Sequence, residues 1–193
     1  MTTALLPAAI PPGGGPRPRH WTCAEFHRFG DLGAFEGRRA MLIDGVIVEE
    51  GPMNPPHAVT LGLVEEAIRV AFGAGWWLRG QLPLVLGLDT DPEPDLAVVP
   101  GRPRDYTAHP TTAALVVEVA DSSFDFDTED KRRLYARSGI AEYWVVDINA
   151  RRVLVYRDPR NGDYGLQQSL DAAATVSPLA VPTATLRVTD LLI

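Results

Sequence analysis

"LVVEVADSS", residues 115–123, places one carboxylate in the middle of a stretch that is otherwise apolar up to Ala120. Its leucine, valines and alanine would lie on both faces of an extended chain, a pattern typical of a central strand that is covered by helices on each side. Burying an unpaired carboxylate costs on the order of several kcal/mol, which is comparable with the whole stability margin of a small domain. Glu118 therefore requires either a neutralising partner or a cation.

The flanking sequence predicts an α/β fold in which a mixed sheet is flanked by two main helices. The predicted helices cover 21–30, 54–75 and 127–139. Thr22 caps the first helix. The second has apolar positions at Val59, Leu63, Ala67 and Val70 and ends at Gly73 and Gly75. The predicted strands cover 75–80, 82–87, 94–99 and 113–120, with further short strands in 163–193. Two hairpins are predicted: one over 40–51 with its turn at Asp44-Gly45, and one over 141–158 with its turn at Asn149-Ala150.

Length and composition favour a single domain over 21–193, preceded by a flexible tail over 1–20 that is rich in proline and glycine. No apolar run approaches the roughly 20 residues of a membrane helix, and the start lacks the basic head of a signal peptide. One cysteine, Cys23, excludes an internal disulfide and a cysteine-rich metal site. These features predict a cytoplasmic protein with no membrane partner.

The net charge of −7 argues against a nucleic-acid partner, because phosphate backbones attract basic surfaces. Acidic nucleases nevertheless hold part of their negative charge in a metal site, where bound cations reverse the local sign. The eighteen basic residues comprise seventeen arginines and one lysine, Lys131. Because only lysine is a compact point charge that can give up its proton, the position of this residue carries information.

Three charged groups converge in the predicted layout: Asp95 at the start of a strand, Glu118 inside the next strand, and Lys131 in the helix that follows. If the two strands are neighbours, their carboxylates can share a hard cation such as Mg²⁺, which binds one or two carboxylates, several waters and a substrate phosphate. Such an ion lowers the pKa of a water, and a nearby lysine orients that water or stabilises negative charge. Asp127 and Tyr135 lie on the helix face of Lys131, at i−4 and i+4.

Each of these residues also has a structural interpretation. Glu118 can be a core acid paired with Lys131, and Asp127–Lys131 can be an ordinary surface pair on a helix. Asp127 also fits a helix-start acid and Tyr135 a core contact. His57 can be a lone structural histidine, and nothing in the sequence demands a site role for Gln81 on its strand. Asp44 fits a turn residue, and Tyr143 and Trp144 fit aromatic residues of the core or of a subunit interface. The acids interpreted as solvated are Glu49, Glu50, Glu65 and Glu66.

Several segments together resemble a known family. They are "LIDGVIVEE", "NPPH", "EPDLAVVP", "LVVEVADSS", "DTEDKRRLYARSGIAEYWVVD" and "VLVYR". In order and spacing, over roughly residues 21–190, they resemble the Uma-type family of putative restriction endonucleases in the PD-(D/E)XK nuclease superfamily. The resemblance implies a restriction-endonuclease-like PD-(D/E)XK core and a homodimer, which the aromatic strand "EYWVVD" and the acidic surface also suggest.

The superfamily pattern implies that Asp95 and Glu118 are metal ligands and that the carbonyl of Val119 is a further ligand. The lysine expected two residues after Glu118 is replaced by Ala120, and the Uma-type pattern resembles one in which Lys131 takes its place on the following helix. The resemblance also suggests that His57 reaches the site. Asp95, Glu118 and Lys131 are accordingly the expected catalytic residues, with His57, Asp127, Tyr135 and Gln81 as secondary candidates.

The function expected from this reasoning is a Mg²⁺-dependent DNA endonuclease in which Mn²⁺ can substitute, with arginines near 102–104 and 132–137 helping to hold the backbone. Two alternatives remain open. One is an inactive nuclease-fold module that binds nucleic acid or protein, which the acidic charge and the displaced lysine support. The other is a metal-dependent hydrolase of another phosphate ester.

Overall fold

The computed structural model describes residues 17–193, so the first sixteen residues of the predicted tail lie outside the described part. Its centre is a six-stranded mixed sheet with the order β3-β4-β5-β6-β7-β8, in which only β5 and β6 are parallel. The predicted mixed sheet is confirmed. The strands are β3 (Trp76–Gly80), β4 (Leu96–Pro100), β5 (Leu115–Ala120), β6 (Glu142–Asp147), β7 (Arg152–Arg160) and β8 (Asp163–Asp171).

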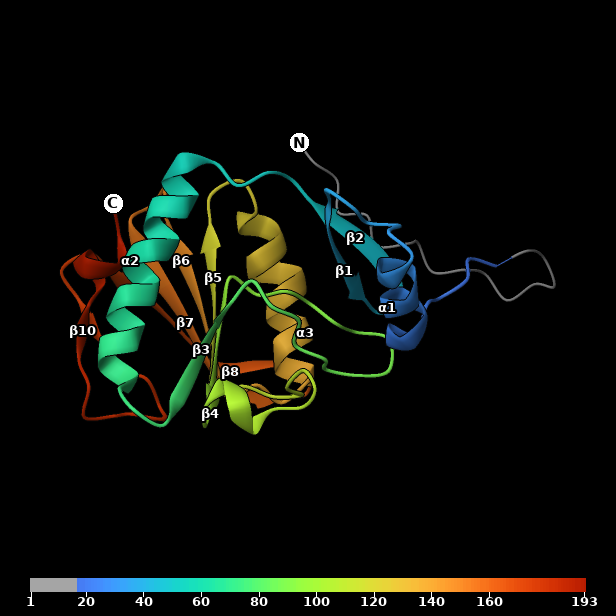
Figure 1. The fold of residues 1–193 in the computed structure, drawn as a ribbon. Helices are drawn as coiled ribbons and strands as arrows, with labels where there is room; N and C mark the ends of the chain where they lie inside the picture. Colours follow the sequence, from blue (N-terminus) through green and yellow to red (C-terminus); the bar gives the residue numbers. More distant parts are fainter. Residues whose placement is uncertain (1–16) are drawn as a thin grey trace.

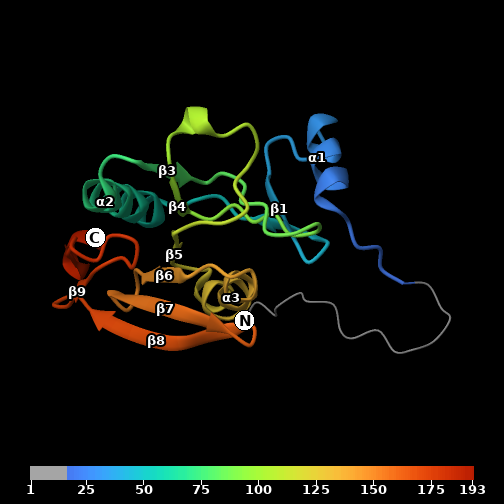
Figure 2. The same ribbon diagram turned by 90° about the horizontal axis from the view of Figure 1, so that it is seen from below.

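Helices cover both faces of this sheet (Figures 1 and 2). On one face lie α2 (Pro55–Phe72) and the C-terminal segment, which contains β9 (Thr175–Val176), β10 (Leu186–Arg187) and the 3₁₀ helix η3 (Val188–Leu191). On the other face lie the π-helical segment η2 (Phe126–Lys131) and α3 (Arg132–Arg137), which connect β5 to β6. A parallel pair requires such a crossover, because no tight turn can join the end of one strand to the far end of its neighbour.

All residues of β5 and of β6 are buried. This follows from the two helical layers and explains why "LVVEVA" and "EYWVVD" are apolar on both faces. Tyr143 and Trp144 on β6 are core residues with 0% exposure. Their interpretation as core residues is confirmed, and β6 therefore does not support the predicted homodimer, which stays a prediction.

A second, smaller unit packs beside the α3 face (Figure 2). It contains α1 (Cys23–Asp31) and the hairpin of β1 (Arg39–Ile43) and β2 (Val46–Glu50), both of which were predicted. Thr22 caps α1 through a reciprocal capping box with Glu25. The turn residues Asp44 and Gly45 have φ values of 50° and 75°, as a two-residue hairpin turn requires.

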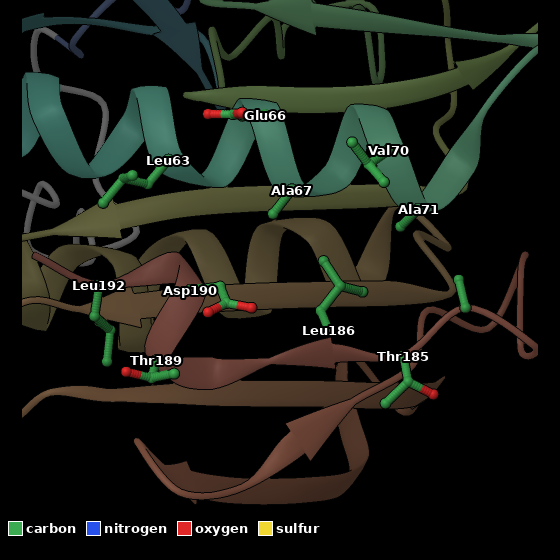
Figure 3. Close-up of a pocket in the computed structure, with 11 residues that line it drawn as sticks. Leu63, Glu66, Ala67, Val70, Ala71, Thr185, Leu186, Thr189, Asp190 and Leu192 are labelled. Atoms are coloured by element: carbon green, nitrogen blue, oxygen red, sulfur yellow. The ribbon is translucent and has the colours of Figure 1, made fainter.

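The buried face of α2 is not the predicted one. Val59 and Val70 are 55% and 80% exposed, while Leu63 and Ala67 are half-buried beside an open groove of about 640 Å³ against the C-terminal segment (Figure 3). Because α2 is apolar on more than one face, periodicity alone could not select the stripe that meets the sheet. The residues that are buried are Thr60, Val64, Ile68 and Phe72.

Two other predictions require correction. Segment 82–87 is not a strand: Pro83 has no N–H, and the amides of Leu84, Val85 and Leu86 donate to the carbonyls of three different loop residues, Pro92, Pro110 and Thr90. The predicted short strands after residue 163 begin instead with the nine-residue β8, which pairs along β7. The amides of segment 82–87 bond to loop residues instead of a neighbouring strand. β8, in contrast, pairs with β7 through a local tight turn at Asn161-Gly162, where both residues have positive φ.

The helix that carries Lys131 begins with two α-helical residues, Phe124 and Asp125, and continues as the π-helical turn η2. A π-helical turn uses i→i+5 hydrogen bonds and is frequent at functional sites. Asp127 lies in the first turn of η2, which agrees with its interpretation as a helix-start acid, and its side chain is buried. Lys131 is the last residue of the turn and is also buried.

Candidate active site

Asp95 directly precedes β4 and Glu118 lies in β5, and these two strands are antiparallel neighbours, as predicted. The backbone N–H of Asp95 donates to Glu118 Oε2 at 3.2 Å, and the N–H of Val119 donates to Asp95 Oδ2 at 2.9 Å. Each carboxylate is therefore held by the backbone of the opposite strand. Asp95 is 5% exposed and Glu118 is 1% exposed.

Lys131 points from its helix into this pair of carboxylates. Its Nζ lies 3.1 Å from Glu118 Oε1, 3.3 Å from Asp127 Oδ1 and 3.3 Å from Glu50 Oε1. The residue is only 3% exposed. The interpretation of Asp127–Lys131 as a surface pair is wrong, because both side chains are buried beside Glu118.

The two secondary candidates on the same helix also reach the site. The hydroxyl of Tyr135 donates to Glu118 Oε1 at 2.7 Å, so this tyrosine is both a core residue and a partner of the carboxylate. Asp127 Oδ2 accepts a hydrogen bond from Ser123 Oγ at 2.5 Å. Its other oxygen, Oδ1, is buried and accepts no hydrogen bond, although Lys131 Nζ is near.

His57 and Gln81 contact the other carboxylate. His57 Nε2 lies 3.2 Å from Asp95 Oδ1, and Gln81 Nε2 donates to the same oxygen at 3.4 Å. His57 is oriented by the start of α2, where its backbone N–H donates to the side chain of Asn54, the N-cap residue. The structure therefore brings together the side chains of Asp95, Glu118 and Lys131 and of the four secondary candidates, His57, Asp127, Tyr135 and Gln81.

Glu50 is a member of the site that sequence reasoning missed. It was interpreted as a solvated acid, yet its Oε1 lies 3.3 Å from Lys131 Nζ and its Oε2 lies 3.0 Å from Arg39. A usable signal was present in "VIVEE". Glu49 and Glu50 are adjacent on a strand and must point to opposite faces, so both could not face the same solvent.

Burial and charge set the protonation of this cluster. Burial raises the pKa of Glu118 well above its usual value, and the neighbouring Asp95 and Asp127 add to this, against the opposing effect of Lys131. Burial by itself lowers the pKa of Lys131, but the surrounding carboxylates outweigh it and raise that pKa well above the usual value. Lys131 is therefore an ammonium ion that cannot neutralise all of its neighbours.

The second carboxylate behaves differently. Burial raises the pKa of Asp95, but the hydrogen bond with His57 and the charge of Lys131 outweigh it, so the net shift is downward. The same hydrogen bond raises the pKa of His57. Asp95 is therefore the stable anion of the pair, whereas Glu118 ionises at a cost.

The donor set fits a hard divalent cation by its chemistry. Asp95, Glu118 and Asp127 bring three carboxylates into a buried space that contains one ammonium group, and Asp127 Oδ1 has no hydrogen-bond donor. Within residues 17–193, no group of three or more His, Cys, Asp or Glu side chains converges in metal-ligand geometry. The fit therefore rests on excess negative charge and on oxygen donors, which Mg²⁺ and Mn²⁺ accept.

Comparison with known proteins assigns the family. The model of the Uma2 family, whose description is "Putative restriction endonuclease", matches residues 23–189. The chain belongs to the Uma2 family. Among solved structures, it is similar to a putative nuclease belonging to DUF820 from Anabaena variabilis, with 18% sequence identity, a TM-score of 0.66, and coverage of 79% of this chain and 88% of that chain. No curated protein matches the sequence.

The Uma2 assignment confirms the resemblance seen in the sequence, and the structural similarity confirms the restriction-endonuclease-like fold. Ala120 occupies the position of the superfamily lysine and is fully buried, so no side chain on β5 supplies an amine. Lys131 brings its amine within 3.1 Å of Glu118 from the helix.

The arginines expected to contact phosphate have different surroundings. Arg132 pairs with Asp163 and Arg137 pairs with Asp44, whereas Arg104 is exposed in the connection before β5. Of the helices in the described part of the chain, none combines the length and the apolar character needed to cross a membrane.

Proposed function

We propose that this Uma2 protein is an endonuclease that hydrolyses phosphodiester bonds in DNA and depends on Mg²⁺, with Mn²⁺ able to substitute. The observation that carries the proposal is the meeting of Asp95 and Glu118, from neighbouring strands, with the single lysine of the chain in a buried site with excess negative charge. Family membership supports the nuclease class.

In the proposed site, Asp95, Glu118 and the carbonyl of Val119 hold the ion. A bound divalent ion lowers the pKa of a water and neutralises charge on phosphorus. The protein supplies the orientation of its ligands: the backbone N–H groups of Asp95 and Val119 hold one oxygen of each carboxylate, and Tyr135 holds the second oxygen of Glu118. Positioning of this kind is what catalytic ligands require.

Lys131 has the proposed role of a charged donor to the attacking water or to a phosphate oxygen. Its ammonium group is fixed among Glu118, Asp127 and Glu50, so it is held in place before substrate binds. His57 and Gln81 hold the other side of Asp95 and are proposed as positioning residues. Asp127 has the proposed role of orienting Lys131.

A second candidate is a nuclease-fold module that binds nucleic acid without cleaving it. Two features favour this second candidate: alanine, at position 120, stands where the superfamily pattern expects the catalytic lysine, and the chain has a net charge of −7. Such a module would gain nothing from a divalent ion. Thermal stabilisation by Mn²⁺ and cleavage in Mn²⁺ therefore separate the two candidates.

The test is cleavage of supercoiled plasmid and of single-stranded DNA in Mg²⁺ or Mn²⁺, beside melting curves with and without the ion. We expect Asp95→Asn and Glu118→Gln each to abolish cleavage and to remove the metal-induced rise in Tm. Glu66→Gln, which changes an exposed acid on α2, is the matched control and should behave as the wild type. Cleavage by Glu118→Gln at the wild-type rate would overturn the assignment.

Lys131 variants extend the same assay. Lys131→Met and Lys131→Arg should each lower the cleavage rate by about 10²–10³. Methionine removes the charged donor, and the planar guanidinium is too large to take the place of the compact ammonium group. Lys131→Met should also destabilise the fold by about 3 kcal/mol, since it leaves buried carboxylates without their partner. RNA and nucleotide substrates, run in parallel, distinguish DNA cleavage from hydrolysis of other phosphate esters.

A further inference from the structure

A second pocket lies beside the edge strand β3, outside the carboxylate site. Its volume is about 670 Å³, and it is as open to solvent as the groove beside α2. The pocket is bounded by β3, α1 and the connection between β4 and β5. Its polar and aromatic lining comprises His27, Trp77, Arg79, Tyr106, Thr107, His109 and Thr111.

Arg79 is the charged group of this pocket and is only 2% exposed. Its Nη2 donates to the carbonyl of Pro83 at 2.8 Å and lies 3.3 Å from His109 Nδ1. The guanidinium carbon lies 4.4 Å from the centre of the Trp77 ring. Its Nε is buried and has no hydrogen-bond partner. A buried, unpartnered guanidinium N–H is costly, so Arg79, which lines the pocket, has hydrogen-bonding capacity that the protein does not satisfy.

Two histidines, His27 and His109, also line the pocket, and the orientation of each ring is set by a neighbouring side chain. Because Arg79 donates to Nδ1 of His109, the neutral ring of His109 carries its proton on Nε2. His109 is exposed, so this N–H is available to a ligand. His27 Nε2 lies 2.6 Å from Asp91 Oδ2, and the buried carboxylate fixes the orientation of this ring.

The aromatic residues form one wall of the pocket. The rings of Trp77 and Tyr106 lie 5.4 Å apart, and the hydroxyl of Tyr106 donates to the carbonyl of Pro100 at 2.6 Å. Both rings are partly exposed. Fixed aromatic rings of this kind stack on unpaired bases, with a contribution of about 1–3 kcal/mol per base.

The register of the sheet places this pocket beside the carboxylate site. Arg79 on β3 pairs with Ala97 on β4, so their side chains lie on the same face of the sheet. Asp95 is two residues before Ala97 and therefore lies on this face as well, about 7 Å along the chain from Ala97. Gln81, two residues after Arg79, contacts Asp95 directly. A chain that crosses the carboxylate site can therefore reach the pocket within a short distance.

We infer that this pocket binds one unstacked nucleoside monophosphate unit, with its phosphate on Arg79 and His109 and its base on Trp77 and Tyr106. The inference rests on the proposed function for its link to cleavage: the unit is a nucleotide of the substrate strand close to the bond that is cut. A free mononucleotide has the same chemistry and is the other source of such a ligand.

Binding is measured by isothermal titration calorimetry on the full chain in EDTA, so that no cleavage can occur. The probes are deoxyadenosine monophosphate, deoxyadenosine, inorganic phosphate and a short single-stranded DNA oligonucleotide. The monophosphate should bind more tightly than deoxyadenosine or phosphate, because each of these lacks one half of the recognised unit. His109→Ala and Arg79→Gln should weaken binding by about tenfold or more. His20→Ala, an exposed histidine that does not line the pocket, is the matched control.

Melting curves show whether Arg79→Gln still folds, and the exposed His109→Ala keeps the test decisive if it does not. Equal affinity of wild type and His109→Ala for both the monophosphate and the oligonucleotide would overturn the inference, as would absence of binding at millimolar concentration. If His109→Ala loses affinity for the oligonucleotide alone, the ligand of the pocket is a nucleotide of a DNA strand. If it loses affinity for the monophosphate alone, the ligand is a free nucleotide. Binding that depends on His109 in a protein that never cleaves supports the pocket and refutes the proposed function.

Discussion

Glu118 is surrounded by more negative charge than Lys131 can neutralise. Its Oε1 accepts the hydroxyl of Tyr135 and lies 3.1 Å from Lys131 Nζ, and its Oε2 accepts the N–H of Asp95. Asp127 nevertheless competes for the same ammonium group. The buried acid therefore has a partner and still has unbalanced charge around it, which is the arrangement that a cation would complete.

This charge excess predicts the stability of Glu118→Gln in metal-free protein. Because the pKa of Glu118 is raised in the folded state, the folded protein holds this proton more tightly than the unfolded chain. The contribution of the carboxyl group to stability is therefore present at low pH and is lost as the pH rises from the usual range of glutamic acid through the folded-state pKa. Glutamine does not ionise, so Glu118→Gln should equal the wild type at acid pH and exceed its Tm at neutral pH.

The measurement is a series of melting curves in EDTA from acid to neutral pH. Glu65→Gln, which removes an acid from α2 in an ion pair with Arg69, is the control for the loss of one charge. A variant that is less stable than the wild type at neutral pH would show that Glu118 stabilises the fold as an anion.

Most of the candidate site could be predicted from single residues. A carboxylate inside an apolar strand, an aspartate after Pro94 and a unique lysine each stand out in the sequence. Glu50 could not be placed in this way, because its contact with Lys131 joins positions 81 residues apart. The burial of Asp127 was missed for a related reason, since it depends on β5 and β6 packing beneath the helix.

Several elements could be predicted because their signals are local. The hairpin at Asp44-Gly45, the cap at Thr22 and the end of α2 at Gly73 each depend on residues within a few positions. The buried face of α2 and the irregular segment 82–87 could not be predicted, because distant partners decide both.

Glu142 on β6 connects its strand to β7 and to the C-terminal segment through hydrogen bonds. It has 0% exposure, and it accepts hydrogen bonds from Trp144 on its own strand, from Arg157 on β7 at 2.6 and 2.8 Å, and from the N–H of Leu179 at 2.6 Å. Glu142→Ala should cost about 3–5 kcal/mol, because it leaves the guanidinium and the amide without an acceptor. Urea denaturation measures this loss.

The exposed pair of Arg187 and Asp190 is the control for Glu142. Arg187→Met should cost under about 1 kcal/mol, since both charges remain in water when the pair is broken. Similar losses for Glu142→Ala and Arg187→Met would mean that Glu142 does not hold β6 to β7 and to the C-terminal segment.

At the scale of the whole molecule, the sheet is most protected at its centre and least protected at β8. Every residue of β5 and β6 is buried between helical layers, whereas residues 165–169 of β8 are exposed at an edge (Figure 2). Native-state hydrogen exchange should therefore be slowest at the amides of β5 and β6 and fastest, within the sheet, along β8. Exchange at Val117 as fast as at Gln168 would contradict this order.

The arginine-rich composition has a practical consequence for labelling. Lys131 supplies the only ε-amino group of the chain, and that group is enclosed by three carboxylates. An amine-reactive reagent cannot acylate a lysine of the native protein without entering this enclosure. The rate of acylation of Lys131 is therefore a built-in reporter of how often the enclosure opens, and it requires neither an introduced probe nor a substrate.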